Sequence, residues 1–184
     1  MAKGKGKGQQ FERDVCRQLS LWVSGGKSKN LFWRSSQSGG RATTLRKKGE
    51  DLSVHAGDVC AIDPAGEKFC WTFFIECKCL KTLQLHAFFY PKNKGILPAM
   101  WAKCRRQARM YHKVPLLICK ENAKPTLLLS YRRLFGDYLL PLAELTYPEL
   151  SAYSFVDVLG LCADDVIGVF SSCDVDSLGN PCES

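Results

Sequence analysis

Two carboxylates and an amine are spaced along the chain in a way that could bind a metal ion. Asp58 lies upstream of the tripeptide Glu76-Cys77-Lys78, which follows the apolar run 71–75. Because side chains alternate along a strand, Glu76 and Lys78 share one face. Charges that end a buried strand are costly unless they are paired or bind a metal. We therefore expect Asp58 and Glu76 to bind a hard divalent cation and Lys78 to position or deprotonate a water. The alternative is a plain ion pair of Glu76 and Lys78 at a solvated strand end, with Asp58 in an ordinary loop.

A third carboxylate, Glu12, falls on the apolar side of a helix that is predicted to follow Gly8. A period of 3.6 residues places Glu12 inside the apolar stripe, whereas the opposite, solvated face carries Arg13, Arg17 and Ser20. A carboxylate that faces the core is more often a metal ligand or a catalytic group than a surface residue. The alternative is that Glu12 reaches solvent near the helix N-terminus, where its charge suits the helix dipole.

A segment between this helix and Asp58 has the composition of a phosphate-binding loop. Arg34, Ser35, Ser38 and Arg41 offer guanidinium groups, hydroxyls and backbone N–H groups to phosphate oxygens. A plain flexible loop would have the same composition. His55 could contact a phosphate or act as an auxiliary base, although a lone loop histidine is more often incidental.

The positive charge is concentrated before Gly136. All 26 Lys and Arg residues and nine of the 18 Asp and Glu residues precede it, so residues 1–135 carry 26 − 9 = +17 and residues 136–184 carry −9. A basic body of this kind is typical of a protein that binds a polyanion, usually nucleic acid.

Residues 98–113 are predicted to form a second amphipathic helix with a basic outer face. Arg105, Arg106 and Arg109 lie on that face, and we expect them to contact DNA because like charges without acidic neighbours repel one another. A merely solvated basic face is the alternative. Gln107 borders the apolar stripe and could reach the site.

These residues, taken in order, resemble the PD-(D/E)XK nuclease superfamily over about residues 8–130. The order is Glu12 on the first helix, Arg34 with its Ser/Gly loop, Gly57-Asp58, and an apolar strand ending in Glu76-Cys77-Lys78. The pattern is most similar to archaeal-type Holliday-junction resolvases and their phage relatives. The resemblance implies an α/β, restriction-endonuclease-like fold, with a mixed central sheet flanked by helices in the order helix-strand-strand-strand-helix-strand.

The resemblance also implies roles for the residues. Asp58, Glu76, the Cys77 carbonyl and Glu12 would bind Mg²⁺ or Mn²⁺, and Lys78 would hold the attacking water. Arg34 to Ser38 would lie near the scissile phosphate. Resolvases of this type act as homodimers, which predicts a dimer here.

Two features differ from the superfamily pattern. Gly57 stands where the superfamily name expects proline, and the insertion Leu80–Leu97 is unlike the compact resolvases. In addition, residues 63–66 have the sequence of a type I turn, and a tight hairpin there would pair Asp58 with Trp71. A shared cation therefore requires a longer connection, about residues 63–71, or a bulge.

The chain is predicted to hold one nuclease domain, residues 9–135, between two flanking segments. Residues 1–8 would be a flexible basic arm, and residues 136–184 an acidic extension whose apolar stretches dock on the body and whose end, from Ser171, is disordered. Neither a membrane span nor a secretory signal is evident, so we expect an intracellular protein with reduced cysteines, in the host cytoplasm if a phage encodes it.

We therefore expect a magnesium-dependent endonuclease that cuts branched DNA such as a four-way junction. One alternative is a nuclease of the same superfamily that acts on linear or single-stranded DNA in repair, recombination or restriction. Another is a DNA-binding protein that kept the fold without catalysis.

Overall fold

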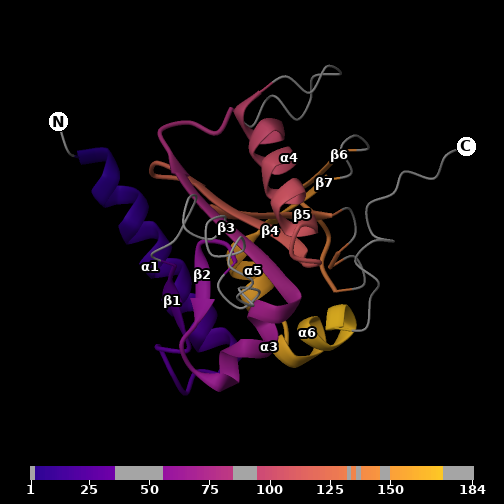
Figure 1. The fold of residues 1–184 in the computed structure, drawn as a ribbon. Helices are drawn as coiled ribbons and strands as arrows, with labels where there is room; N and C mark the ends of the chain where they lie inside the picture. The colour runs from indigo at the N-terminus through magenta and orange to yellow at the C-terminus, as the bar shows by residue number, and fades with distance from the viewer. Residues whose placement is uncertain are drawn as a thin grey trace, which may run out of the picture.

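The computed structural model of the chain is built around a mixed β-sheet with helices on both faces (Figure 1). Its strands are β3 (Phe73–Leu80), β4 (Val114–Glu121), β5 (Thr126–Tyr131), β6 (Ala143–Leu145) and β7 (Leu150–Ser154). They lie in the order β3-β4-β5-β7-β6, with β3 and β4 parallel and the other neighbours antiparallel. The predicted fold class is confirmed. The structure describes residues 3–35, 56–84, 95–131, 134–135, 138–145 and 150–171.

The two parallel strands form the buried centre of the sheet. Phe73, Phe74 and Ile75 of β3 are buried, as is the run Val114–Cys119 of β4. Such continuous apolar strands are typical of a sheet covered on both faces. A parallel pair needs a crossover, and helix α4 (Ile96–Arg109) lies on that connection.

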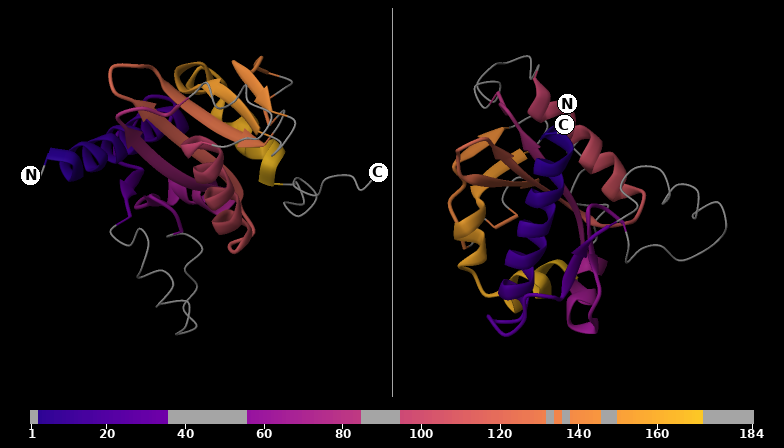
Figure 2. Two further views of the ribbon diagram at one scale, coloured as in Figure 1. Left: turned by 90° about the horizontal axis from the view of Figure 1, so that it is seen from above. Right: turned by 90° about the vertical axis from the view of Figure 1, so that its left-hand side faces the viewer.

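Helices α1 and α4 cover opposite faces of the sheet. In the view from above, α4 lies on one side of the strands, whereas α1 (Lys3–Val23) and α5 (Phe155–Leu159) lie on the other (Figure 2). Helix α1 begins at Lys3, so residues 3–8 of the predicted flexible arm are helical. Ser20 of α1 was predicted on the solvated face, and this is wrong, because its side chain is fully buried.

A helix replaces the turn that was predicted after Asp63. The Asp63 carboxylate accepts a hydrogen bond from the Ala65 N–H, and Pro64 occupies the first turn of α3 (Pro64–Thr72). An acidic cap followed by proline is as typical of a helix start as of a turn, which explains the difference. The helix provides the longer connection that a shared cation requires, since it separates β2 (Val59–Ala61) from β3. Strand β2 pairs instead with β1 (Phe32–Arg34).

Part of the acidic extension is built into the central sheet. Strand β7 pairs with β5 along five residues, and β6 pairs with β7. Phe155 of α5 is buried in the common core, and α6 (Ala163–Ser171) packs against α3. The described part of the extension therefore belongs to the same structural unit as the nuclease segment. The predicted disorder from Ser171 falls, beyond that residue, outside the described part of the chain.

Among the described residues, no helix has the length and hydrophobicity needed to cross a membrane.

Candidate active site

Backbone hydrogen bonds to β3 and to the residue after β1 position Asp58. Its N–H donates to the Ile75 carbonyl of β3 at 2.7 Å, and its carbonyl accepts from the N–H of Ser35, just after β1, at 2.9 Å. Gly57 forms an isolated parallel bridge with Ile75 and has a φ of +98°. These contacts bring Asp58 beside Ile75, the residue that precedes Glu76 in β3, as the resemblance implied. Strand β3 continues to Leu80, so Glu76 and Lys78 lie within the strand and not after its end.

The side chains of Asp58, Glu76 and Lys78 meet at this point. The Lys78 Nζ atom lies 2.5 Å from Glu76 Oε1 and 3.5 Å from Asp58 Oδ2, and it donates to the Cys77 carbonyl at 3.0 Å. The Cys77 N–H donates to Asp58 Oδ2 at 2.8 Å. Both carboxylates are buried. One ammonium group is therefore surrounded by three oxygens, and these are the oxygens expected to bind the metal.

Burial and mutual charge shift the proton affinities of these groups. Burial, followed by the negative charge of Asp58, raises the pKa of Glu76, and the two nearby lysines only partly oppose this. Burial opposes the charge of Lys78, but Asp58 and Glu76 outweigh it, so the pKa of Lys78 is raised. The site therefore stabilises a positive charge at the position of the Lys78 ammonium group.

The same oxygen set suits a hard divalent cation. Mg²⁺ and Mn²⁺ prefer carboxylate and carbonyl oxygens, and the ammonium group of Lys78 stands in for a cation among three of them. Only two of these ligands are side chains. No group of three or more His, Cys, Asp or Glu side chains in the described part of the chain could hold a metal.

Glu12 pairs with Arg34 and not with the residues of this cluster. Its Oε2 atom accepts from Arg34 Nε at 2.9 Å, and both side chains are partly buried. The Glu12 charge also raises the pKa of the buried Cys77 thiol, after burial, Asp58 and Cys16, so Glu12 lies close enough to Cys77 to influence it. The structure thus joins two predicted site residues, Glu12 and Arg34, to each other.

Helix α4 brings a lysine to the site that the sequence did not single out for it. Lys103 Nζ lies 3.9 Å from Glu76 Oε1. In the sequence Lys103 is one cation of a basic helix face, and no local pattern directs it toward Glu76. The Gln107 Oε1 atom, one turn later on α4, is buried and has no hydrogen-bond partner.

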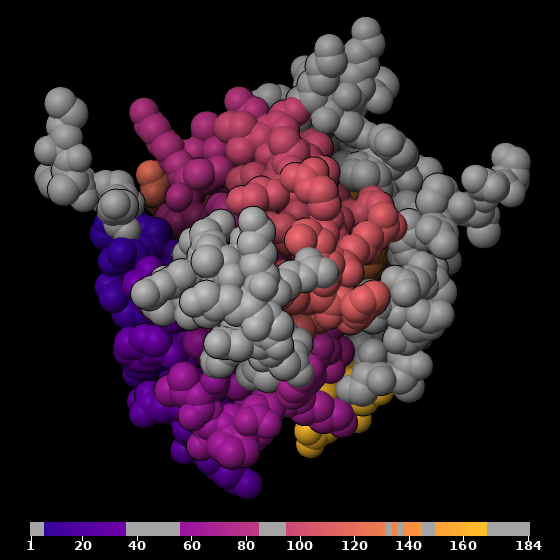
Figure 3. Space-filling view, viewed as in Figure 1, coloured from indigo at the N-terminus to yellow at the C-terminus, as the bar shows by residue number. Residues whose placement is uncertain are grey.

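The other residues that were predicted to bind DNA lie in different surroundings. The Arg105 guanidinium lies 5.7 Å from the centre of the Tyr131 ring, whereas Arg106 and Arg109 are exposed. The α4 segment forms part of the molecular surface that Figure 3 shows. Ser35 is buried beside Asp58. Ser38, Arg41 and His55 lie outside the described residues.

A comparison of the chain with known protein families assigns it to one of them. A family model described as "Phage putative PDDEXK endonuclease" matches residues 3–146, more than half of the chain. The chain belongs to this phage PD-(D/E)XK family. No curated protein and no solved structure matches it. Membership implies a nuclease that acts on DNA, and PD-(D/E)XK nucleases generally use divalent metal ions.

One difference from the PD-(D/E)XK pattern has a structural explanation. Proline holds φ near −65°, whereas Gly57 adopts +98° in the approach to β3. A Cβ atom at this position would lie only 2.5 Å from the Ile75 carbonyl oxygen. Glycine therefore allows the close contact of the two backbones that places Asp58.

Proposed function

We propose that this chain is a Mg²⁺- or Mn²⁺-dependent DNA endonuclease that cuts four-way junctions. The observation that carries metal dependence is the cation-binding geometry of three oxygens, from Asp58, Glu76 and the Cys77 carbonyl, around the Lys78 ammonium. Family membership supports the nuclease activity. The junction and the homodimer come from the resemblance to Holliday-junction resolvases.

Each described group has a role in phosphodiester hydrolysis. A bound divalent cation would supply positive charge to the phosphate oxygens as the transition state forms. Asp58, Glu76 and the Cys77 carbonyl would hold it, and Lys78, released from these oxygens, would orient the attacking water. Glu12 would fix the Arg34 guanidinium, through the 2.9 Å contact, for binding to a phosphate.

The DNA would lie across the site and the outer face of α4. Arg106 and Arg109 would bind backbone phosphates there, and their side chains are exposed. Arg105, Ser35, Ser38 and Arg41 complete the proposed DNA-binding set, with Gln107 and His55 as accessory groups. The unpartnered Gln107 Oε1 atom supports a role for that residue, because buried acceptors are usually hydrogen-bonded.

Substitution of the three central side chains tests the mechanism. We expect Asp58→Asn, Glu76→Gln and Lys78→Ala each to reduce Mg²⁺-dependent cleavage by about 100-fold or more, because each removes a charge at the reacting phosphate. Binding of a labelled junction in Ca²⁺ should persist. Glu67→Gln on α3, which removes an exposed carboxylate, is the matched control. Full activity of any of the three variants would contradict this mechanism.

A substrate panel separates the proposal from its alternatives. Labelled four-way junction, linear duplex and single strand are incubated with and without Mg²⁺. Paired symmetric nicks in the junction would support the resolvase, and sedimentation of the complex would show whether a dimer makes them. Cleavage of linear or single-stranded DNA alone would support the other nuclease. Binding without cleavage would support the non-catalytic protein.

A further inference from the structure

Two ammonium groups converge on a single carboxylate oxygen. Lys78 Nζ lies 2.5 Å from Glu76 Oε1, and Lys103 Nζ lies 3.9 Å from the same atom. Their surroundings differ. Lys78 is held by three oxygens, whereas the Lys103 side chain is 55% exposed and stays beyond hydrogen-bonding distance of Glu76. Lys103 can therefore turn toward an incoming anion without leaving a short hydrogen bond.

The packing of α4 explains why Lys103 borders the site. Trp101, Cys104 and Ala108 are fully buried against the sheet, so this face fixes the rotation of the helix. Glu76 is the largest charge contribution, after burial, to the raised pKa of the Cys104 thiol, which shows that this turn of α4 lies over the acidic cluster. Lys103 directly precedes Cys104, so it projects at the edge of the buried face, beside Glu76.

Asp58 and Glu76 carry two negative charges, and Lys78 and Lys103 carry two positive charges, so the four groups together are neutral. A divalent cation bound among these groups would give them a net positive charge, which favours an anion at this edge. Helix α4 contains no acidic residue that could neutralise Lys103 further. An exposed ion pair at this distance contributes little to stability, so the position of a second lysine here has no evident structural role.

We propose that Lys103 binds a non-bridging oxygen of the phosphate that is cut, as a second catalytic lysine beside Lys78. This inference rests on the proposed nuclease function and adds a residue to its site. Lys78 serves the attacking water, whereas Lys103 stabilises the charge that develops on the phosphate itself. Both the binding of DNA and the rate of cleavage should therefore depend on Lys103.

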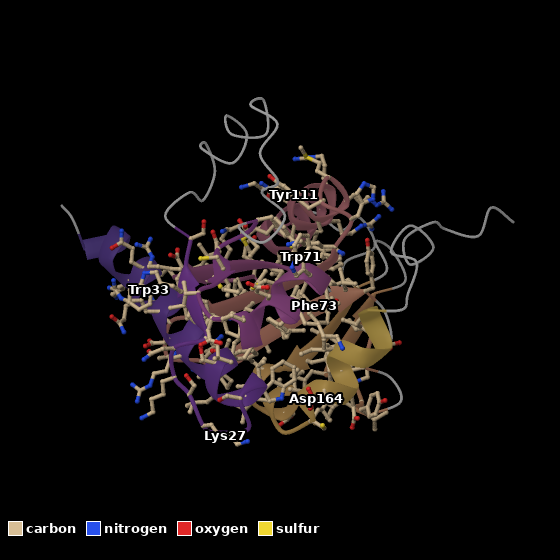
Figure 4. The ribbon with its side chains drawn as sticks, turned by 60° about the horizontal axis from the view of Figure 1, so that its bottom comes forward. Lys27, Trp33, Trp71, Phe73, Tyr111 and Asp164 are labelled. Carbon is tan, nitrogen blue, oxygen red and sulfur yellow. The ribbon has the colours of Figure 1, made fainter. Side chains whose placement is uncertain are left out.

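The test compares Lys103→Ala with Lys103→Arg in the full chain. Lys27→Ala is the control, because Lys27 is exposed and lies at the opposite side of the molecule from Tyr111, which follows α4 (Figure 4). We expect Lys103→Ala to lower the single-turnover cleavage rate at saturating enzyme about 10- to 100-fold. In Ca²⁺, the slope of log affinity against log salt should fall by about 1, since one phosphate contact is lost. Lys103→Arg should retain most of the cleavage rate and most of the salt slope.

The outcomes separate this inference from the function on which it rests. If the wild type cuts DNA and Lys103→Ala matches it in rate and salt slope, the role of Lys103 is overturned and the nuclease stands. The same holds if Lys27→Ala loses as much as Lys103→Ala. If Lys103→Ala reduces the rate while its salt slope is unchanged, the phosphate contact is overturned. If the wild type neither cuts nor binds DNA, both proposals fall.

Discussion

At the scale of single residues, the site depends on short polar contacts around one ammonium group. Lys78 reaches Asp58, Glu76 and its neighbour's carbonyl because a strand places residues 76 and 78 on the same face. Asp58 joins them from another segment, through a backbone contact that only a residue without a side chain permits.

Gly57→Ala tests that backbone contact. The alanine Cβ would clash with the Ile75 carbonyl oxygen and would sit at a positive φ, so we expect the free energy of unfolding to fall by about 2–4 kcal/mol. Cleavage should fall as well, because Asp58 moves with its neighbour. Urea unfolding and a cleavage assay measure the two effects.

Gly25→Ala is the matched control for this substitution. Gly25 also has a positive φ, +59°, but a Cβ atom there meets no other atom within 4 Å. We expect a loss of about 1 kcal/mol from backbone strain alone, with normal cleavage. Equal effects at the two glycines would show that the contact with Ile75 is unimportant.

At the scale of elements, one serine fixes the position of β1 against α1. The Ser20 hydroxyl donates to the Cys16 carbonyl and accepts from the N–H groups of Leu31 and Phe32, each at 3.1 Å. Strand β1 carries Arg34 and leads to Ser35, so this contact holds one wall of the site in place.

Ser20→Ala should therefore destabilise the protein more than an ordinary surface change. Two buried N–H groups would lose their acceptor, and we expect the free energy of unfolding to fall by about 2–4 kcal/mol. Ser28→Ala is the control, since its hydroxyl also accepts from a backbone N–H, that of Asn30, but at an exposed position. We expect it to cost less than about 0.5 kcal/mol in urea unfolding. Equal losses would contradict the role of Ser20.

At the scale of the whole molecule, the core is rich in protonated thiols. The eight described cysteines are free, and all of them except Cys79 and Cys162 are buried. Burial raises the pKa of Cys16, Cys70 and Cys119 from 9.0 to about 12. These thiols hold their protons more tightly in the folded chain than in the unfolded chain.

Stability should consequently decline in alkaline solution. The contribution of each such thiol is fully present below pH 9.0, the unfolded pKa, and is lost as the pH rises toward 12. We expect a loss of about 1 kcal/mol per thiol for each pH unit above 9. Urea unfolding between pH 8 and pH 11 measures it. In the Cys119→Ala variant, the free energy of unfolding should decline less steeply, by about 1 kcal/mol per pH unit above 9. An unchanged decline would contradict the role of this thiol in the alkaline loss of stability.

The oppositely charged parts of the chain are not separate units in the folded molecule. The sequence predicts a basic body and an acidic extension, yet β7 of that extension pairs directly with β5 of the body. Chain segments of opposite net charge thus share one sheet, because strand pairing depends on backbone hydrogen bonds and apolar packing rather than on net charge.

The amino-acid sequence by itself determined the features that repeat over a few residues. The alternation along β3 predicts that Glu76 and Lys78 share a face, and the amphipathic period predicts α1 and α4. The order of the motifs predicts the fold class, which the structure confirms. These inferences succeed because local backbone geometry determines the direction of neighbouring side chains.

Only the tertiary structure decided which distant residues meet. The approach of Asp58 to β3 depends on α3, whose start has the sequence of a turn. The pairing of Glu12 with Arg34, the burial of Ser20 and the position of Lys103 beside Glu76 each depend on how two elements pack. No local period encodes such contacts, because they arise from the combined packing of segments that lie far apart along the chain.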